Sequence, residues 1–228
     1  MKKKLWVNGD SHTAGSYSPN NVSDPFAKQI AQRLNLEYTN LALPGGSNQR
    51  IIRTTIDALP DLDPQQTFLL IGWSSWERTE WYWCNAWHAI CGDPGYELPV
   101  FAQERWRQHS EHYRNQFTDK ISDHDLWSKS KEQEHAIWVF HHLLHNLGYK
   151  FLFFLGCANT FRWESTHEST SKLPWLQNTW AHDPYQPTGF SEFCEARGHK
   201  KDKLWHFGQD AHTDWADYLV DIIESKLP

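Results

Sequence analysis

Residues 67–72 read TFLLIG, a short run that is apolar on both faces and ends in glycine. Strands that are buried on both sides occur at the centre of parallel sheets, where helices cover the two faces. Two further strand-like segments precede this run, at residues 4–9 and 37–41, and another, residues 150–156 (KFLFFLG), follows it. Residues 67–72 are therefore predicted to form an inner strand of an α/β protein.

Helical patterns separate these strands. Apolar residues recur every three or four positions near residues 26–34, 51–59, 130–147 and 213–225. Alternation of strand and helix is typical of βαβ units, whose parallel sheet carries helices on both faces. We predict one domain over residues 1–228, a flavodoxin-like three-layer α/β/α sandwich whose central parallel sheet has about five strands.

An insertion at residues 74–129 interrupts this alternation. It is rich in aromatic residues, and the whole chain contains 14 Trp, 12 Phe and 8 Tyr. Long irregular stretches inside a compact domain are usually functional, so the insertion is predicted to form a lid. The alternative is that it folds on itself as a small aromatic core. The spacing of Cys84 and Cys91 indicates a helix within it.

Charge and composition argue against several classes of partner. The net charge of −6 argues against binding to nucleic acid or to an anionic membrane. No apolar run approaches the ~20 residues of a membrane span. The opening residues MKKKLWVNGD carry basic side chains without an apolar segment after them, and the four cysteines form no CxxC pair. We therefore expect a cytoplasmic protein with reduced thiols and no signal peptide.

Polar and glycine-rich segments follow the predicted strands. They are residues 9–12 (GDSH), 40–48 (NLALPGGSN) and 72–75 (GWSS), and residues 206–212 (HFGQDAH) precede the last helix. In an open parallel sheet, ligands bind beyond the carboxyl ends of the strands. A serine, a glycine turn and a histidine at one edge supply a nucleophile, backbone N–H donors and a base, which indicates acyl transfer.

The sequence resembles the SGNH (GDSL-type) hydrolase family in three places. Residues 9–11 match the GDS of its first block, residues 40–45 match the N-x-x-x-x-G of its second block, and residues 206–216 match its tail. The similarity covers about residues 4–72 and 150–225. It implies that Ser11 is the nucleophile and His206 the general base, that the N–H groups of Ser11 and Gly45 form an oxyanion hole, and that no cofactor or metal is used.

The sequence departs from the family pattern in two places. One is the Asn that donates to the oxyanion, and the other is the acid that orients the catalytic histidine. The third block is normally G-x-N-D, whereas residues 72–75 contain no Asn, as in GDSL-like proteins of tailed phages. Ser74 or Asn48 is predicted to replace the missing donor; otherwise the enzyme is slow or inactive. The family acid would stand at Lys203, so Asp202 is predicted to orient His206, with a Ser–His dyad as the alternative.

The other histidines receive different predictions. His212 is the second choice for the base, but its position near the start of the last helix also predicts a capping or packing role. His141, His142 and His145 lie opposite the apolar stripe of their helix and are predicted to be solvated rather than to bind a metal.

The tryptophans are the candidates for substrate binding. Trp73 and Trp76 follow the third strand directly. The alternative for Trp73 is burial in the hydrophobic core, together with Trp6, Trp138 and Trp215. Flat aromatic rings stack on the C–H faces of sugars, which favours a carbohydrate ester over a lipid.

These observations lead to one prediction and one alternative. We predict a serine esterase that cleaves an O-acyl group, such as acetyl, from a small-molecule or glycan ester through an acyl-enzyme on Ser11. The alternative is a glycan-binding or virion-structural protein that kept the fold and lost the chemistry, and for a phage protein the virion is then the expected location.

Overall fold

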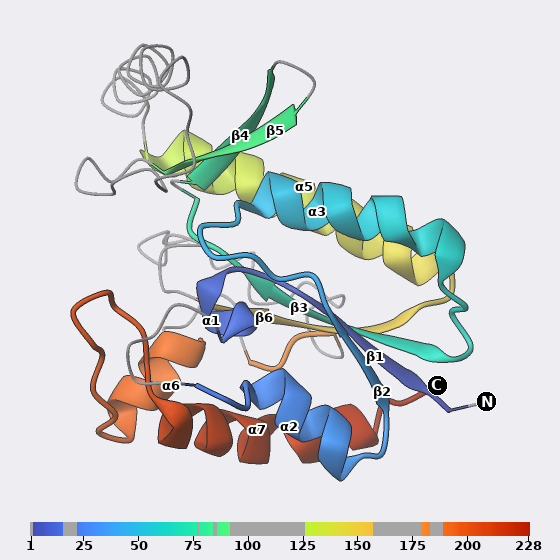
Figure 1. Cartoon of the computed structure of the whole chain (residues 1–228). Coiled ribbons are helices and arrows are strands. Elements are labelled where there is room, and N and C mark those ends of the chain that lie inside the picture. Colours follow the sequence, from blue (N-terminus) through green and yellow to red (C-terminus); the bar gives the residue numbers. More distant parts are fainter. Residues whose placement is uncertain are drawn as a thin grey trace, which may run out of the picture.

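A parallel sheet forms the centre of the computed structural model, which describes residues 2–15, 22–76, 78–83, 86–91, 126–156, 179–182 and 189–228. Its four strands follow the order β2-β1-β3-β6 (Figure 1). They are β1 (Lys4–Asn8), β2 (Glu37–Asn40), β3 (Thr67–Trp73) and β6 (Lys150–Leu155).

Residues 179–181 extend the sheet beyond β6. The N–H of Phe153 donates to Thr179 O at 2.7 Å, and the N–H of Ala181 donates to Phe153 O at 2.8 Å, which is a parallel bridge. Together with the four strands, this edge confirms the predicted parallel sheet of about five strands.

Helices cover both faces of the sheet, as the three-layer prediction requires (Figure 1). One face carries α2 (Phe26–Arg33), α6 (Phe190–Ala196) and α7 (Gln209–Glu224). The other face carries α3 (Asn48–Ala58), which continues into η1 (Leu59–Asp61), and α5 (Leu126–Asn146). Two separate apolar clusters result, one on each face.

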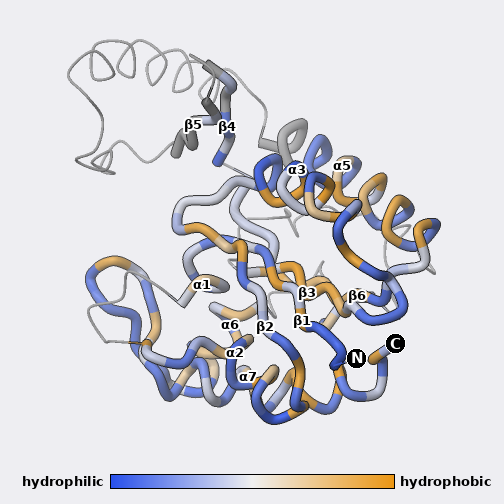
Figure 2. Tube along the Cα trace, turned by 45° about the vertical axis from the view of Figure 1, so that its right-hand side comes forward, coloured by the Kyte–Doolittle hydropathy of each residue, from blue (hydrophilic) through white to orange (hydrophobic). Residues whose placement is uncertain are grey.

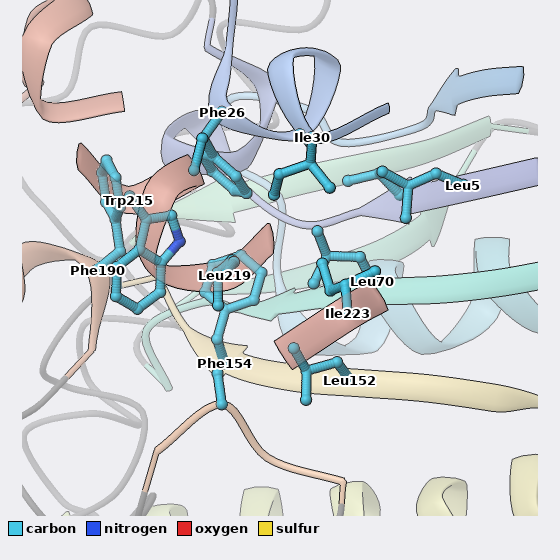
Figure 3. Close-up of a cluster of buried hydrophobic side chains, with 14 of the residues drawn as sticks. Leu5, Phe26, Ile30, Leu70, Leu152, Phe154, Phe190, Trp215, Leu219 and Ile223 are labelled. Atoms are coloured by element: carbon cyan, nitrogen blue, oxygen red, sulfur yellow. The ribbon is translucent and has the colours of Figure 1, made fainter. Parts of the chain in front are cut away.

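Aromatic rings and branched aliphatic side chains fill the cluster between the sheet and the helices α2, α6 and α7. Figure 3 shows Phe26 and Ile30 of α2 facing the strand residues Leu5 and Leu70, with Trp215 of α7 beside them. Figure 2 shows the same separation of buried and exposed elements: β3 and β6 are largely hydrophobic, whereas α3 contains both hydrophobic and hydrophilic residues. The core thus fixes the carboxyl ends of the strands, where the candidate site lies.

The buried face of α5 differs from the predicted one. His141, expected in solvent, is only 4% exposed; its Nε2 lies 3.1 Å from Thr179 Oγ1, and its ring packs edge-on against Phe151. The reason is that the 179–182 edge adds a second surface against which this helix packs. His145 is exposed as predicted, whereas Trp138, expected in the core, is 44% exposed.

The insertion begins with an antiparallel hairpin made of β4 (Arg78–Trp83) and β5 (Ala86–Cys91). Cys91 therefore lies in a strand, and the prediction of a helix there is wrong. Residues 92–125 are outside the described part of the chain, so the lid remains a prediction. None of the helices that the structure describes combines the length and the apolar character that crossing a bilayer requires.

Candidate active site

Ser11 lies on a sharp turn at the carboxyl end of β1. It begins the short helix α1 (Ser11–Ala14), and Asp10 caps this helix by accepting the N–H of His12 at 3.0 Å. Gly15 ends the turn with a φ of +66°, a conformation that suits glycine, and its N–H donates to Ser11 O. Ser11 is thereby held in a fixed strand-to-helix turn, with 6% of its surface exposed.

Two glycines allow this turn to press against the sheet. A Cβ placed on Gly9 or on Gly72 would lie 2.3 Å from Thr13 Oγ1. Any larger residue at either position would push α1 away from the ends of β1 and β3. Gly9 and Gly72 therefore allow the Ser11 turn to lie close against the ends of β1 and β3.

The loop after β2 lies against the same turn. The Asn40 side chain donates to Thr13 O at 3.4 Å, and a Cβ on Gly46 would lie 3.2 Å from Gly9 O. Gly45 has a φ of +73°, which explains the glycine there. The structure thus brings the loop that carries Gly45 beside the turn that carries Ser11.

His206 reaches this region from the other end of the chain. Its ring centroid lies 5.5 Å from that of His12, the residue after Ser11. Burial lowers the pKa of His206, and the positive charge of Arg78 lowers it further, while the carboxylates of Asp202 and Asp10 oppose this effect. The neutral imidazole, which can accept a proton, is therefore favoured near pH 7.

Asp202 acts on the backbone of His206 rather than on its ring. Its Oδ1 accepts the N–H groups of Leu204 at 2.7 Å and of His206 at 3.0 Å. His206 is half-buried, and within the described residues its buried Nδ1 has no hydrogen-bond partner. The predicted contact of the acid with the ring is therefore not present, and Asp202 instead holds the turn that carries His206.

His212 has a structural role. It is 3% exposed, and its Nδ1 accepts the N–H of Phe26 at 3.3 Å. Its ring stacks on that of Phe26 at 5.7 Å, and burial lowers its pKa to about 3. The packing prediction is confirmed, and this nitrogen is not available to act as a base.

Both predicted substitutes for the missing Asn are engaged with the protein. Asn48 Oδ1 accepts the N–H of Ser74 at 2.8 Å, and its Nδ2 donates to Ser74 O at 3.0 Å. The Ser74 hydroxyl accepts from Arg78 Nη1 at 2.8 Å and lies 3.4 Å from Asp10 Oδ2. Asn48 and Ser74 thus fix the chain that follows β3.

The two tryptophans after β3 differ in exposure. Trp73 is fully buried and packs edge-on against Phe153 at 5.0 Å and Phe140 at 5.9 Å. Its assignment to substrate binding is wrong, because β3 extends to this residue and turns its side chain toward α5. Trp76 is half-buried in the turn before β4 and remains a candidate.

Arg78 is the site residue that the sequence did not reveal. Its Nη1 lies 2.9 Å from Oδ2 of the fully buried Asp10, and its side chain is 20% exposed. The guanidinium also lowers the pKa of His12, which burial brings to about 4. The only available signal was indirect: a carboxylate directly after a buried strand needs a cationic or hydrogen-bonded partner.

The site therefore combines a buried serine turn, a neutral imidazole and a fixed positive charge. Such a set can carry out nucleophilic acyl transfer. Across the described ranges, no three histidine, cysteine, aspartate or glutamate side chains gather in a way that would hold a metal ion.

Comparison with solved structures identifies the class of fold. The psychrotrophic esterase EstA from Pseudoalteromonas sp., in a structure inhibited by monoethylphosphonate, has a TM-score of 0.54 at 10% identity, with 98% of this chain and 97% of that chain covered. Lipolytic G-D-S-L proteins follow from Veillonella parvula (TM-score 0.43, 10% identity, 97% and 98% covered) and Desulfitobacterium hafniense (0.38, 14%, 96% and 99%). The first match shows that the chain has the α/β/α fold of a known esterase, whereas the other two scores are too low to support an argument.

Sequence comparison identifies the family. Residues 11–170 match the model described as "Family of unknown function (DUF6071)". The chain belongs to this family. No curated protein matches it. The similarity to tailed-phage proteins stays a prediction.

Proposed function

We propose that the protein is a serine ester hydrolase in which Ser11 is the nucleophile and His206 the general base. The contact between the His206 and His12 rings, at 5.5 Å, carries this proposal. It brings the tail of the chain to the Ser11 turn; the direct hydrogen bond between Ser11 and His206 that catalysis requires would form in the complex with substrate. The fold shared with an esterase supports the same reading.

The proposed reaction has two steps. His206 takes the proton of the Ser11 hydroxyl while Oγ attacks the ester carbonyl carbon, and then returns that proton to the departing alcohol. Water, activated by the same imidazole, next hydrolyses the acyl-enzyme and frees the acid. No cofactor takes part. The lowered pKa of His206 keeps the base neutral for both steps.

The negative charge that develops on the ester carbonyl oxygen in the transition state must be stabilised by hydrogen-bond donors. We assign this role to the N–H groups of Ser11 and Gly45, with the Arg78 guanidinium supplying positive charge where the family has Asn. Since Asn48 and Ser74 bond to each other and to their neighbours, their role is to position the loop. The substrate we propose is an O-acyl, such as acetyl, ester of a carbohydrate.

Labelling with a fluorophosphonate probe, together with hydrolysis of p-nitrophenyl acetate, tests this proposal. The wild type is expected to be labelled and active, and Ser11→Ala to lose both properties while remaining folded by circular dichroism. Ser225→Ala, at the exposed end of α7, is the matched control and should behave as wild type. Labelling that persists in Ser11→Ala would remove the assignment.

The second candidate is a glycan-binding or virion-structural protein without catalysis. It is favoured by the position of Asp202, which bonds to the backbone of His206 and leaves the ring Nδ1 without a partner among the described residues. A folded wild type that neither reacts with the probe nor hydrolyses any ester would favour this candidate.

A further inference from the structure

Trp205 has an unusual position directly before His206. Its side chain is 73% exposed, and its φ is +66°. Bulky side chains rarely adopt positive φ, and such a conformation costs on the order of 1–3 kcal/mol. Leu204 beside it is also exposed, at 51%.

The turn around Trp205 is firmly held. The N–H of Asp202 donates to His206 O at 2.8 Å, and the N–H of Trp205 donates to Asp202 O at 3.0 Å. The Asp202 carboxylate also accepts two N–H groups of the turn, at 2.7 and 3.0 Å. Glycine or asparagine would fit this turn with less strain. Folding alone therefore does not explain a tryptophan here.

Contacts connect the exposed ring to the candidate active site. Lys201 Nζ lies 5.6 Å from the centre of the Trp205 ring and 5.4 Å from that of Phe207. The Phe207 ring lies 6.2 Å from the ring of His12. Trp205 is thus linked to the ring of His12 through Lys201 and Phe207.

The surroundings of the ring are basic although the chain is acidic overall. Residues 199–205 contain Lys200, Lys201 and Lys203 and a single carboxylate, Asp202, in a chain whose net charge is −6. Lys200 and Lys203 are exposed, and Lys201 also pairs with Glu195 at 2.6 Å. A flat ring with the Lys201 ammonium group over it, in a segment rich in lysine, suits a sugar that carries a negative charge.

We propose that Trp205 and the lysines around it bind the alcohol part of the substrate, which is an acylated acidic saccharide. The ring stacks on a sugar face, and Lys200 and Lys203 attract the carboxylates of the saccharide. This inference rests on the proposed ester hydrolysis and adds its substrate class. An exposed tryptophan flanked by lysines also suits an anionic lipid surface. We favour the saccharide because Trp205 directly precedes the proposed base His206 in the chain, and the leaving alcohol departs with a proton from that base.

The first experiment compares hydrolysis of three acetyl esters. O-acetylated polygalacturonate is the acidic substrate, acetylated xylan is a less charged one, and ethyl acetate is an ester without a sugar. Trp205→Asn keeps a residue that tolerates positive φ and removes the ring, so it should lower kcat/KM for polygalacturonate about tenfold or more, equivalent to ~1.4 kcal/mol. Hydrolysis of ethyl acetate should fall much less than that of polygalacturonate, and Trp205→Phe should restore part of the loss on the polysaccharide.

Charge reversal tests the role of the lysines. The double variant Lys200→Glu, Lys203→Glu should lower kcat/KM for acetylated polygalacturonate and leave acetylated xylan unchanged. Equal losses on all three esters in Trp205→Asn would mean that the residue only positions His206, and that result would overturn the proposal. So would unchanged kinetics on both polysaccharides.

A binding measurement separates this inference from the proposed function. Calorimetric titration with polygalacturonate needs no catalysis. If the wild type hydrolyses none of the esters but binds polygalacturonate, and Trp205→Asn abolishes that binding, the saccharide subsite stands and the hydrolase proposal falls. If Trp205 instead supports binding to phosphatidylglycerol vesicles and not to the polysaccharide, the saccharide proposal is overturned.

Discussion

Asp10 is fully buried one residue before Ser11, where an unpaired carboxylate would be costly. Arg78 Nη1, the Ser74 hydroxyl and the N–H of His12 compensate for this burial, at 2.9, 3.4 and 3.0 Å. Breaking a buried pair by removing one partner typically destabilises a protein by ~3–5 kcal/mol. Arg78 thus serves both the stability of the turn and the charge of the site.

Replacing Arg78 separates these two effects. Arg78→Ala is expected to lower kcat/KM for p-nitrophenyl acetate by about 10²-fold, the usual loss for one oxyanion-stabilising group. It also removes a charge that lowers the pKa of His206 and leaves Asp10, which raises it, unopposed. The acid limb of the pH–rate profile should therefore move to higher pH. Arg78→Lys, which keeps the charge, is expected to retain more activity and a smaller shift.

Unfolding in urea provides the control for this pair of variants. If Arg78→Ala is less stable but its remaining folded fraction has the wild-type pH profile, the residue is only structural. Unchanged activity in a stable Arg78→Ala variant would exclude the proposed electrostatic role.

Local sequence patterns predicted part of the site. That the GDS turn, Gly72 and the segment with His206 lie together could be predicted, because each stands at a fixed place relative to a strand or to the last helix. Arg78 could not, since its pairing with Asp10 depends on where the insertion folds back. The prediction that Asp202 orients the ring of His206 follows from the resemblance to the family tail, which cannot show that turn N–H groups compete for the same carboxylate.

At the scale of elements, the hairpin β4–β5 is fastened to α3 as well as to the Ser11 turn. Arg53 of α3 makes two hydrogen bonds to the Glu80 carboxylate, at 2.7 and 2.8 Å. The same guanidinium lies over the Trp87 ring, 4.4 Å from its centre. Because Arg78 begins β4, these contacts also bear on how firmly Arg78 is held.

Glu80→Gln should loosen the hairpin. The neutral amide cannot form the paired, charge-assisted contact with Arg53, so hydrogen exchange of residues 78–83 is expected to become faster. Ester hydrolysis should fall by less than in Arg78→Ala, because Arg78 itself is still present. Asp57→Asn is the matched control: Asp57 also pairs with Arg53, at 3.6 Å, but is 66% exposed, so little change is expected. Equal exchange rates in both variants and the wild type would contradict the fastening role.

The periodicity of apolar residues predicts the strands and helices better than it predicts which elements pack against one another. The runs at residues 67–72 and 150–156 are long and apolar enough to identify inner strands. The sequence does not predict the hairpin, because aromatic residues stand at both odd and even positions of residues 78–91 and hide the alternation of a strand. The segment also contains no Asn-Gly or Asp-Gly turn signal. The buried face of α5 was assigned too narrowly because the 179–182 edge pairs with β6 from a distant part of the sequence.

At the scale of the whole molecule, burial lowers the pKa of three histidines, which are His12, His182 and His212. His182 Nε2 accepts the N–H of Leu155 at 3.2 Å, and His212 Nδ1 accepts that of Phe26 at 3.3 Å. A nitrogen that accepts a hydrogen bond cannot carry a proton, so the fold requires the neutral form of both rings. Burial lowers the pKa to about 4 for His182 and His12 and to about 3 for His212.

This requirement predicts a fall in stability at mildly acidic pH. In the unfolded chain these histidines take up protons near pH 6.5, whereas in the folded chain they do so only near pH 4 or below. The unfolded state therefore binds more protons between these values, and the free energy of unfolding should decrease steadily as pH falls from 6.5 to 4. Each histidine accounts for on the order of 3 kcal/mol by pH 4.

Urea unfolding at a series of pH values between 7.5 and 4.5 measures this dependence. His182→Gln removes one of the three groups, so its free energy of unfolding should depend less steeply on pH than that of the wild type, even if it is lower at pH 7.5. His145→Gln, a change at an exposed position of α5, should keep the wild-type slope. A free energy of unfolding that stays constant from pH 7 to pH 4.5 would show that the three rings are not held neutral by the fold.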